Sequence, residues 1–136
     1  MFGADINNPS AIAMYETDAA IHHLGIEILS VEEGLATAAM IVTNNMVNGH
    51  SVCHGGLVFT LADTAMAYAS NSFGSMALAA GASIEFLRPA YSGQRIVATA
   101  RSPHVGRRTA YWDVTVTNPE GDTVAIFRGR TKVIDG

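Results

Sequence analysis

The chain has 136 residues, which fits a single domain large enough to bury a sizeable core. Hydrophobic residues make up 49% and charged residues 15%, so disorder is excluded and part of the apolar surface is expected to lie against other subunits. The net charge of -4 gives no basic footprint for nucleic acid, and the single cysteine, Cys53, excludes an internal disulfide.

Three features of the sequence bear on where the protein is located: its N-terminus, its longest apolar helix and its single cysteine. The N-terminus has neither the basic nor the apolar region of a signal peptide, and the longest apolar helix is too short to span a bilayer. With one cysteine, these features predict a cytoplasmic protein without a membrane partner.

The first third of the chain predicts a helix and a hairpin. Residues 9–21 form a rough helical stripe that starts at a proline, and His22-His23-Leu24-Gly25 is expected to end it. Strands are predicted over 26–31 and 35–42, joined by a turn at Gly34.

A polar loop over residues 43–53 leads into the longest predicted helix, which runs from about His54 to Ser72 with Gly74 as its C-terminal cap. This helix is apolar on nearly every side, which is typical of a buried helix. Its one carboxylate, Asp63, stands out, because Asp is almost never fully buried without a partner.

The last part of the chain predicts four strands, over residues 79–88, 94–101, 108–117 and 123–133, with a hairpin turn at 118–121. Strands joined by hairpins form an antiparallel sheet, and one face of it must be covered. The long helix is the only element able to cover that face. The sequence therefore predicts an α+β fold, an antiparallel sheet around a long central helix, with a short N-terminal helix.

Two motifs carry a family resemblance: Asn48-Gly-His-Ser-Val-Cys-His54-Gly55-Gly56, and Leu61-Ala-Asp63-Thr64. They resemble the PaaI-type (phenylacetic acid degradation) acyl-CoA thioesterases of the hotdog-fold superfamily. The match extends to Asp18 and to residues 85–89, 104–109 and 124–130, and so covers most of the chain. It implies one hotdog thioesterase domain over residues 1–136.

The resemblance also implies an activity, the hydrolysis of phenylacetyl-CoA or hydroxyphenylacetyl-CoA without a cofactor. The backbone N–H of Gly55 would polarise the thioester carbonyl. Asp63 would activate water or attack the carbonyl carbon directly. Asn48 would belong to the same site.

The residues themselves allow this chemistry without proving it. Glycine at the start of a helix presents free N–H groups to an oxyanion, but it can equally serve a tight turn. Asp63 could be a base, or a buried acid bonded to a neighbour. His54 is a secondary member of the site, and the Thr64 hydroxyl could bond either substrate or its own helix backbone.

Helix geometry separates the two main groups. Gly55 and Asp63 are eight residues apart, which is ~12 Å along one helix. An oxyanion donor and a base must each lie within roughly 3 Å of adjacent reacting atoms. We therefore expect Gly55 of one subunit to meet Asp63 of another across a two-fold axis, in a homodimer with two shared sites and as a dimer of dimers.

Coenzyme A brings phosphates, which arginine binds bidentately. The predicted CoA-binding residues are Arg88 with Pro89 beside it, and Arg107 and Arg108 after Gly106 in a turn near His104. Arg128 and Arg130 are weaker candidates. Met66, Tyr68, Asn71 and Phe73 could line the acyl pocket or belong to the core.

Other kinds of site fit less well. Cys53 beside a helix start could form an acyl-enzyme, although no third orienting residue is evident. His50 and His54 lie on a loop without further ligands, so no metal site is predicted. A hotdog dehydratase would need a histidine further along the helix. A non-catalytic acyl-CoA-binding module remains the alternative to an enzyme.

Overall fold

The computed structural model describes residues 1–134. This part of the chain forms one six-stranded sheet in the order β1-β2-β4-β5-β6-β3, with every strand pair antiparallel. The strands are β1 (Glu27–Glu32), β2 (Leu35–Ile41), β3 (Ala77–Phe86), β4 (Arg95–Val105), β5 (Thr109–Thr117) and β6 (Thr123–Val133). The helices are α1 (Pro9–Thr17), α2 (Ala19–Leu24) and α3 (Gly55–Ser70), and single 3-10 turns span Asn44–Met46 and Asn71–Phe73.

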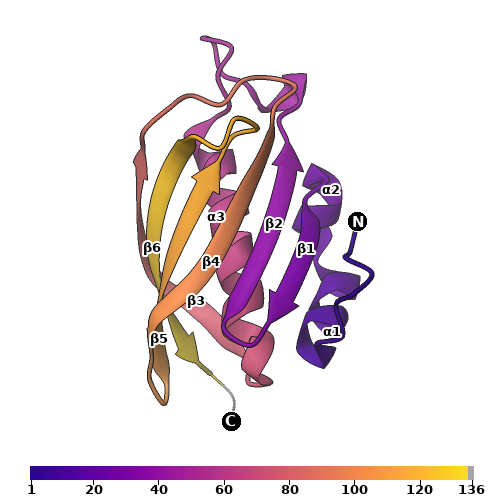
Figure 1. Ribbon diagram of the computed structural model, residues 1–136, viewed down its shortest axis with the longest axis vertical. Helices are drawn as coiled ribbons and strands as arrows, with labels where there is room; N and C mark the ends of the chain where they lie inside the picture. The colour runs from indigo at the N-terminus through magenta and orange to yellow at the C-terminus, as the bar shows by residue number, and fades with distance from the viewer. Residues whose placement is uncertain (135–136) are drawn as a thin grey trace.

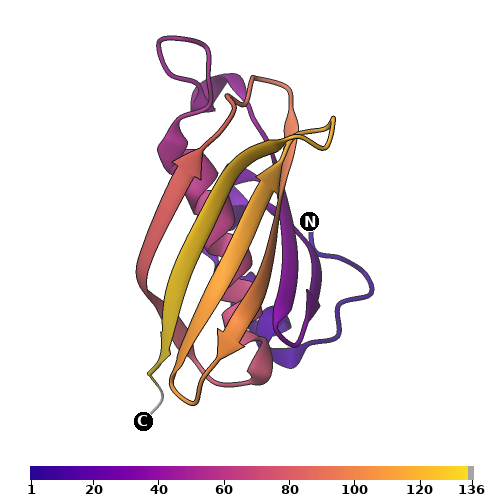
Figure 2. The same ribbon diagram turned by 60° about the vertical axis from the view of Figure 1, so that its left-hand side comes forward.

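The sheet curves around α3, while α1 and α2 lie beside β1 (Figures 1 and 2). Inward-facing residues of the central strands, such as Trp112, Val114 and Ile96, pack against the apolar sides of α3. Gly129 on β6 lets this strand lie close against α3, because a side chain there would collide with Met66. The predicted α+β hotdog fold is confirmed. Within residues 1–134, no helix combines the length and the hydropathy needed to cross a membrane.

The N-terminal helix differs from the prediction, because it is two helices that meet at Asp18. Asp18 leaves the helical region at ψ 82°, and its N–H donates to the Tyr15 carbonyl. The Asp18 carboxylate is held by a 3.1 Å hydrogen bond from the Tyr68 hydroxyl of α3. His22 and His23 therefore continue a helix instead of ending one. The helix ends at Gly25, whose φ is 71°.

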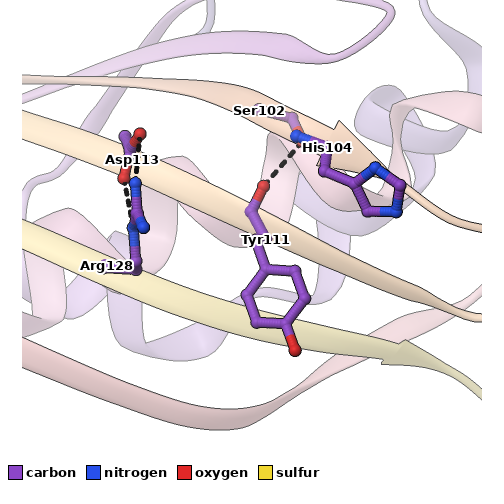
Figure 3. Close-up of polar contacts among 5 residues, drawn as sticks. All are labelled: Ser102, His104, Tyr111, Asp113 and Arg128. Atoms are coloured by element: carbon purple, nitrogen blue, oxygen red, sulfur yellow. Dashed lines mark hydrogen bonds and ion pairs between the residues drawn. The ribbon is translucent and has the colours of Figure 1, made fainter.

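Three strand ends also differ from the prediction by two residues or more, and the first is the start of β3, at Ala77 instead of residue 79. The strand β3 ends at Phe86, two residues early, because the N–H groups of Leu87 and Arg88 both turn to the Val124 carbonyl. The strand β4 continues to Val105 through a bulge. There Ser102 Oγ donates to the Tyr111 carbonyl (2.6 Å; Figure 3) and accepts from the N–H of His104 (3.0 Å). These bonds replace missing ladder bonds and let the strand go on.

The two edges of the sheet are unlike each other. At the β1 edge, Phe2 pairs with Ile28, Gly3 donates to the Ile28 carbonyl (2.8 Å), and Ile28 donates to the Met1 carbonyl (3.0 Å). At the other edge, β3 is exposed along nearly its whole length and carries apolar side chains, with Leu78 56% and Phe86 54% exposed. An open apolar edge of this kind is a ready template for pairing with another chain.

Candidate active site

The loop before α3 fixes the side chain of Asn48. The Asn48 N–H donates to the Val52 carbonyl (2.8 Å), and its side-chain Oδ1 accepts from the N–H groups of His50 (2.8 Å) and Val52 (3.2 Å). Ser51, at the tip, adopts a left-handed φ of 63°. Because the amide oxygen is used to hold the loop, the amide NH₂ of Asn48 is left to donate to a ligand.

The first turn of α3 presents free donors. His54 is the N-cap residue, and its side chain makes no capping hydrogen bond. Its carbonyl accepts from Leu57 (3.0 Å) and Val58 (3.3 Å), whereas the N–H groups of Gly55 and Gly56 have no acceptor within residues 1–134. The positive end of the helix dipole adds to their attraction for an oxyanion.

Gly55 lines a cavity of about 430 Å³, here called the Gly55 cavity, whereas Gly56 is exposed and is not part of its lining. The cavity is lined by Asn48, Val52, Cys53, Gly55, Val58, Phe86, Leu87, Arg88, Pro89, Ala90 and Val124. The structure thus brings four predicted site residues together: Asn48, Gly55, Arg88 and Pro89. Arg88 is held at the rim by a 2.9 Å bond from Nη1 to the Thr123 carbonyl.

Asp63 lies elsewhere, in a second cavity of about 330 Å³ lined by Asp63, Met66, Ala67, Ala77, Leu78, Ala79 and Thr131. We call this the Asp63 cavity. The carboxylate is half-buried and makes no hydrogen bond within residues 1–134, and this burial raises its pKa above the usual aspartate value. Within one chain, Asp63 therefore stands beside the start of β3, whereas Gly55 stands beside its end.

The other candidates on or near α3 behave differently. Thr64 is buried, and its hydroxyl donates to the Thr60 carbonyl (2.7 Å), which favours the alternative of a bond to its own helix. The His54 side chain is exposed next to the Gly55 cavity. Cys53 lines that cavity, but burial raises the pKa of its thiol, which disfavours the thiolate that an acyl-enzyme would need. Tyr68 and Asn71 belong to the core.

Arg107 and Arg108 lie at the other end of α3, in the tight β4–β5 turn closed by a 2.9 Å bond from Gly106 N–H to the Thr109 carbonyl. They line a cavity of about 120 Å³, together with Ser70 and Phe73. Ala77 and Thr131 line both this cavity and the Asp63 cavity. The arginine pair therefore belongs with Asp63 and stands apart from Gly55 of the same chain.

The two weaker arginine candidates already have partners on the outer face of the sheet. Arg128 forms a two-pronged ion pair with Asp113 (2.7 and 2.9 Å), seen in Figure 3, and this pairing raises the pKa of its guanidinium. Arg130 donates to the Ala80 carbonyl (3.2 Å). Both engagements weaken the case for phosphate binding by these two residues.

One site residue was missed by the sequence reasoning. Phe86 ends β3 and places its ring against Gly55, where an added Cβ would meet the ring at 2.8 Å. The only signal in the sequence was its place in the run Glu85-Phe-Leu-Arg-Pro89, between a strand and a candidate phosphate ligand. Nothing local shows that its side chain faces the helix start.

A central helix that begins with free N–H groups, carries a desolvated carboxylate two turns on and is wrapped by an antiparallel sheet defines a hotdog thioesterase. The family model described as "Thioesterase superfamily" matches residues 50–125, and the chain belongs to this family of enzymes.

Individual relatives agree. The chain is 49% identical over 127 residues to the acyl-coenzyme A thioesterase PaaI of Escherichia coli, covering 93% of this chain and 91% of that protein. The structure of the E. coli PaaI protein superposes with a TM-score of 0.92 at 49% identity, over 93% and 92% of the two chains. A Streptococcus mutans protein bound to acetyl CoA follows, with a TM-score of 0.78 at 31% identity over 80% and 88%. The predicted resemblance to PaaI-type thioesterases is confirmed.

Proposed function

We propose that this thioesterase hydrolyses aryl-acetyl-CoA thioesters, such as phenylacetyl-CoA or hydroxyphenylacetyl-CoA, to the free acid and CoA. The observation that carries the proposal is the unbonded N–H of Gly55, a residue that lines an apolar cavity together with Asn48, whose amide NH₂ is free. Support for the acyl group comes from the names of the relatives, a PaaI acyl-CoA thioesterase and a PaaI protein from the phenylacetic acid degradation operon.

The chemistry divides between the two cavities. The thioester oxygen accepts from the Gly55 N–H, which stabilises the negative charge that develops there. Ionised Asp63 either removes a proton from the attacking water or attacks the carbonyl carbon itself. The C–S bond then breaks, and CoA leaves as the thiolate and takes up a proton. When water is the attacking group the carboxylic acid remains, and when Asp63 attacks, water then hydrolyses the acyl–Asp63 anhydride to the acid and free Asp63. A raised pKa makes Asp63 the stronger base.

A two-fold axis brings the two cavities together. The Gly55 cavity lies at the Phe86 end of β3, and the Asp63 cavity at the Ala77 end. If two copies pair antiparallel through their open β3 edges, centred near Ala82, the start of one β3 lies beside the end of the other. Asp63 of one chain then faces Gly55 of its partner, and an obligate dimer supplies two complete sites.

The same pairing assigns each predicted CoA-binding residue to one of the two chains. Arg88 and Pro89 come from the chain that supplies Gly55, because they line its cavity. Arg107 and Arg108 come from the chain that supplies Asp63. The CoA phosphates would thus be bound from both sides of the interface. His54 and Asn48 stay with the Gly55 chain. A further pairing of two dimers, and a cytoplasmic location, remain predictions.

The test is release of free thiol from phenylacetyl-CoA by the wild type and by Asp63→Asn. We expect the variant to lose about 10²- to 10⁴-fold in kcat, the usual contribution of a positioned base. Wild-type kcat/KM should fall as pH drops through the Asp63 pKa, which lies above the ordinary value of about 3.9. Full activity in Asp63→Asn would remove Asp63 from the mechanism. No thiol from any acyl-CoA, with binding intact, would favour the non-catalytic module.

A further inference from the structure

The aromatic ring of Phe86 sits directly on the glycine whose N–H is the proposed oxyanion donor. A Cβ built on Gly55 would lie 2.8 Å from Cζ of that ring and 3.2 to 3.3 Å from its two Cε atoms. The outer edge of the ring therefore touches the Gly55 α-carbon. Gly55 does not have a positive φ, so its backbone conformation does not demand glycine. The ring does.

The Phe86 backbone is fixed, but its side chain is not. Phe86 pairs with Ala125 in the β3–β6 ladder, and the next residue, Leu87, donates to the Val124 carbonyl (2.8 Å). The ring is 54% exposed, and the aromatic pairs within residues 1–134 do not include it. A ring with fixed backbone and one free face can pack against a bound group.

A substrate must meet this ring. A thioester oxygen bonded to the Gly55 N–H lies about 3 Å from that nitrogen. The ring edge is in contact with the α-carbon of the same residue. Phe86 lines the same cavity as Gly55, so an acyl group that occupies this cavity lies beside the ring. Pairing through β3 leaves the ring facing the shared site, because Phe86 points towards α3.

We propose that Phe86 is the residue that selects aryl over straight-chain acyl groups, by packing its ring against the aromatic ring of the substrate. This inference rests on the proposed function and names the group that sets its specificity. Paired aromatic rings gain attraction from their quadrupoles beyond the area they bury, and an alkyl chain of the same size does not. The expected preference that the ring contributes is about twofold to tenfold.

The experiment measures binding, so that it does not depend on turnover. The probes are two ketone analogues that keep the carbonyl oxygen but cannot be hydrolysed, S-(2-oxo-3-phenylpropyl)-CoA (the phenyl probe) and S-(2-oxooctyl)-CoA (the hexyl probe). They are titrated by calorimetry into wild type, Phe86→Leu and Tyr111→Leu. Leucine keeps apolar bulk but removes the ring. Tyr111 is an exposed aromatic residue on the outer face of the sheet and serves as the matched control. Thermal melting confirms that each variant is folded.

We expect Phe86→Leu to weaken binding of the phenyl probe about twofold to tenfold while the hexyl probe is bound as before, and Tyr111→Leu to change neither. An unchanged ratio of the two dissociation constants would overturn the inference, as would equal weakening of both probes or no binding of either by the wild type. Thiol release is measured separately. Ring-dependent selectivity without thiol release would refute the hydrolase, and hydrolysis without ring-dependent selectivity would refute the role of Phe86.

Discussion

At the scale of single residues, Gly55 contributes two properties whose effects can be measured separately. Its missing side chain makes room for the Phe86 ring, and its N–H faces the cavity. Alanine and proline at this position both bring a Cβ to the ring, but only proline lacks the N–H. Proline suits the first position of a helix, and the extended ψ of 134° at His54 suits a residue before proline.

We predict that Gly55→Pro lowers kcat about 10²- to 10³-fold relative to Gly55→Ala, because one oxyanion donor is lost. The measurement is steady-state hydrolysis of phenylacetyl-CoA by both variants, with melting temperatures as the control for folding. Equal rates in the two variants would show that the Gly55 N–H does not serve the reaction.

The grouping of Asn48 with Gly55 around one cavity could be predicted, because both belong to one short motif before the central helix. Their roles in catalysis, and that of Asp63, remain predictions. The hydrogen-bond and ion-pair partners of other candidate residues could not be predicted. The Thr64 hydroxyl donates to the Thr60 carbonyl instead of being free to bond a substrate, and the sequence alone does not distinguish these two bonds. Arg128 looks like a free cation until folding brings it to Asp113, fifteen residues away.

At the scale of elements, the contact between α3 and β6 depends on Gly129. An added methyl group there would collide with the Met66 side chain and lie 2.9 Å from a Phe127 ring atom. We predict that Gly129→Ala lowers the free energy of unfolding by about 1–3 kcal/mol through overpacking. The matched control is Gly56→Ala on α3, where an added Cβ meets nothing within 4 Å.

Chemical denaturation of the two variants checks this prediction. Gly56→Ala should be neutral or slightly stabilising, since alanine favours a helix. A destabilisation of Gly129→Ala no larger than that of the control would mean that the helix can move away from β6 at little cost.

The interior of each element followed from its hydrophobic pattern. The last strand was predicted at 123–133 and is found there, and the central helix was predicted within two residues at each end. Two of the errors lie where a side chain from elsewhere in the chain sets a boundary, and the early end of β3 is set by backbone bonds to Val124. Tyr68 holds the break at Asp18, and Ser102 extends β4 across a bulge. Such bonds join residues far apart in sequence, and no local pattern announces them.

At the scale of the whole molecule, the division of the site between two chains can be tested by combining two inactive variants in one dimer. We predict that heterodimers of an Asp63→Ala chain and a Gly55→Pro chain recover activity at one of their two sites. That site takes Gly55 from the first chain and Asp63 from the second. Dual-tag purification isolates the heterodimer, and mixing without recovery would contradict the shared site.

The arginine pair sharpens this test. Arg107→Ala/Arg108→Ala placed on the Gly55→Pro chain, which supplies Asp63, should raise KM at the recovered site. The same pair of substitutions on the Asp63→Ala chain should leave KM unchanged, because its arginines belong to the dead site. Equal effects from both placements would contradict the assignment of the arginines to the Asp63 side.

The unequal edges of the sheet also limit how far assembly can proceed. Pairing through β3 would join six strands from each chain into one sheet of twelve. Both outer edges of that sheet would then be β1, where Met1 and Gly3 already form hydrogen bonds with the backbone of Ile28. A chain with two open edges could add copies without end and grow into a fibril. With one open edge, strand addition stops after a single partner. Pairing through β3 uses up the open edge of each chain, so no edge is left for a third copy.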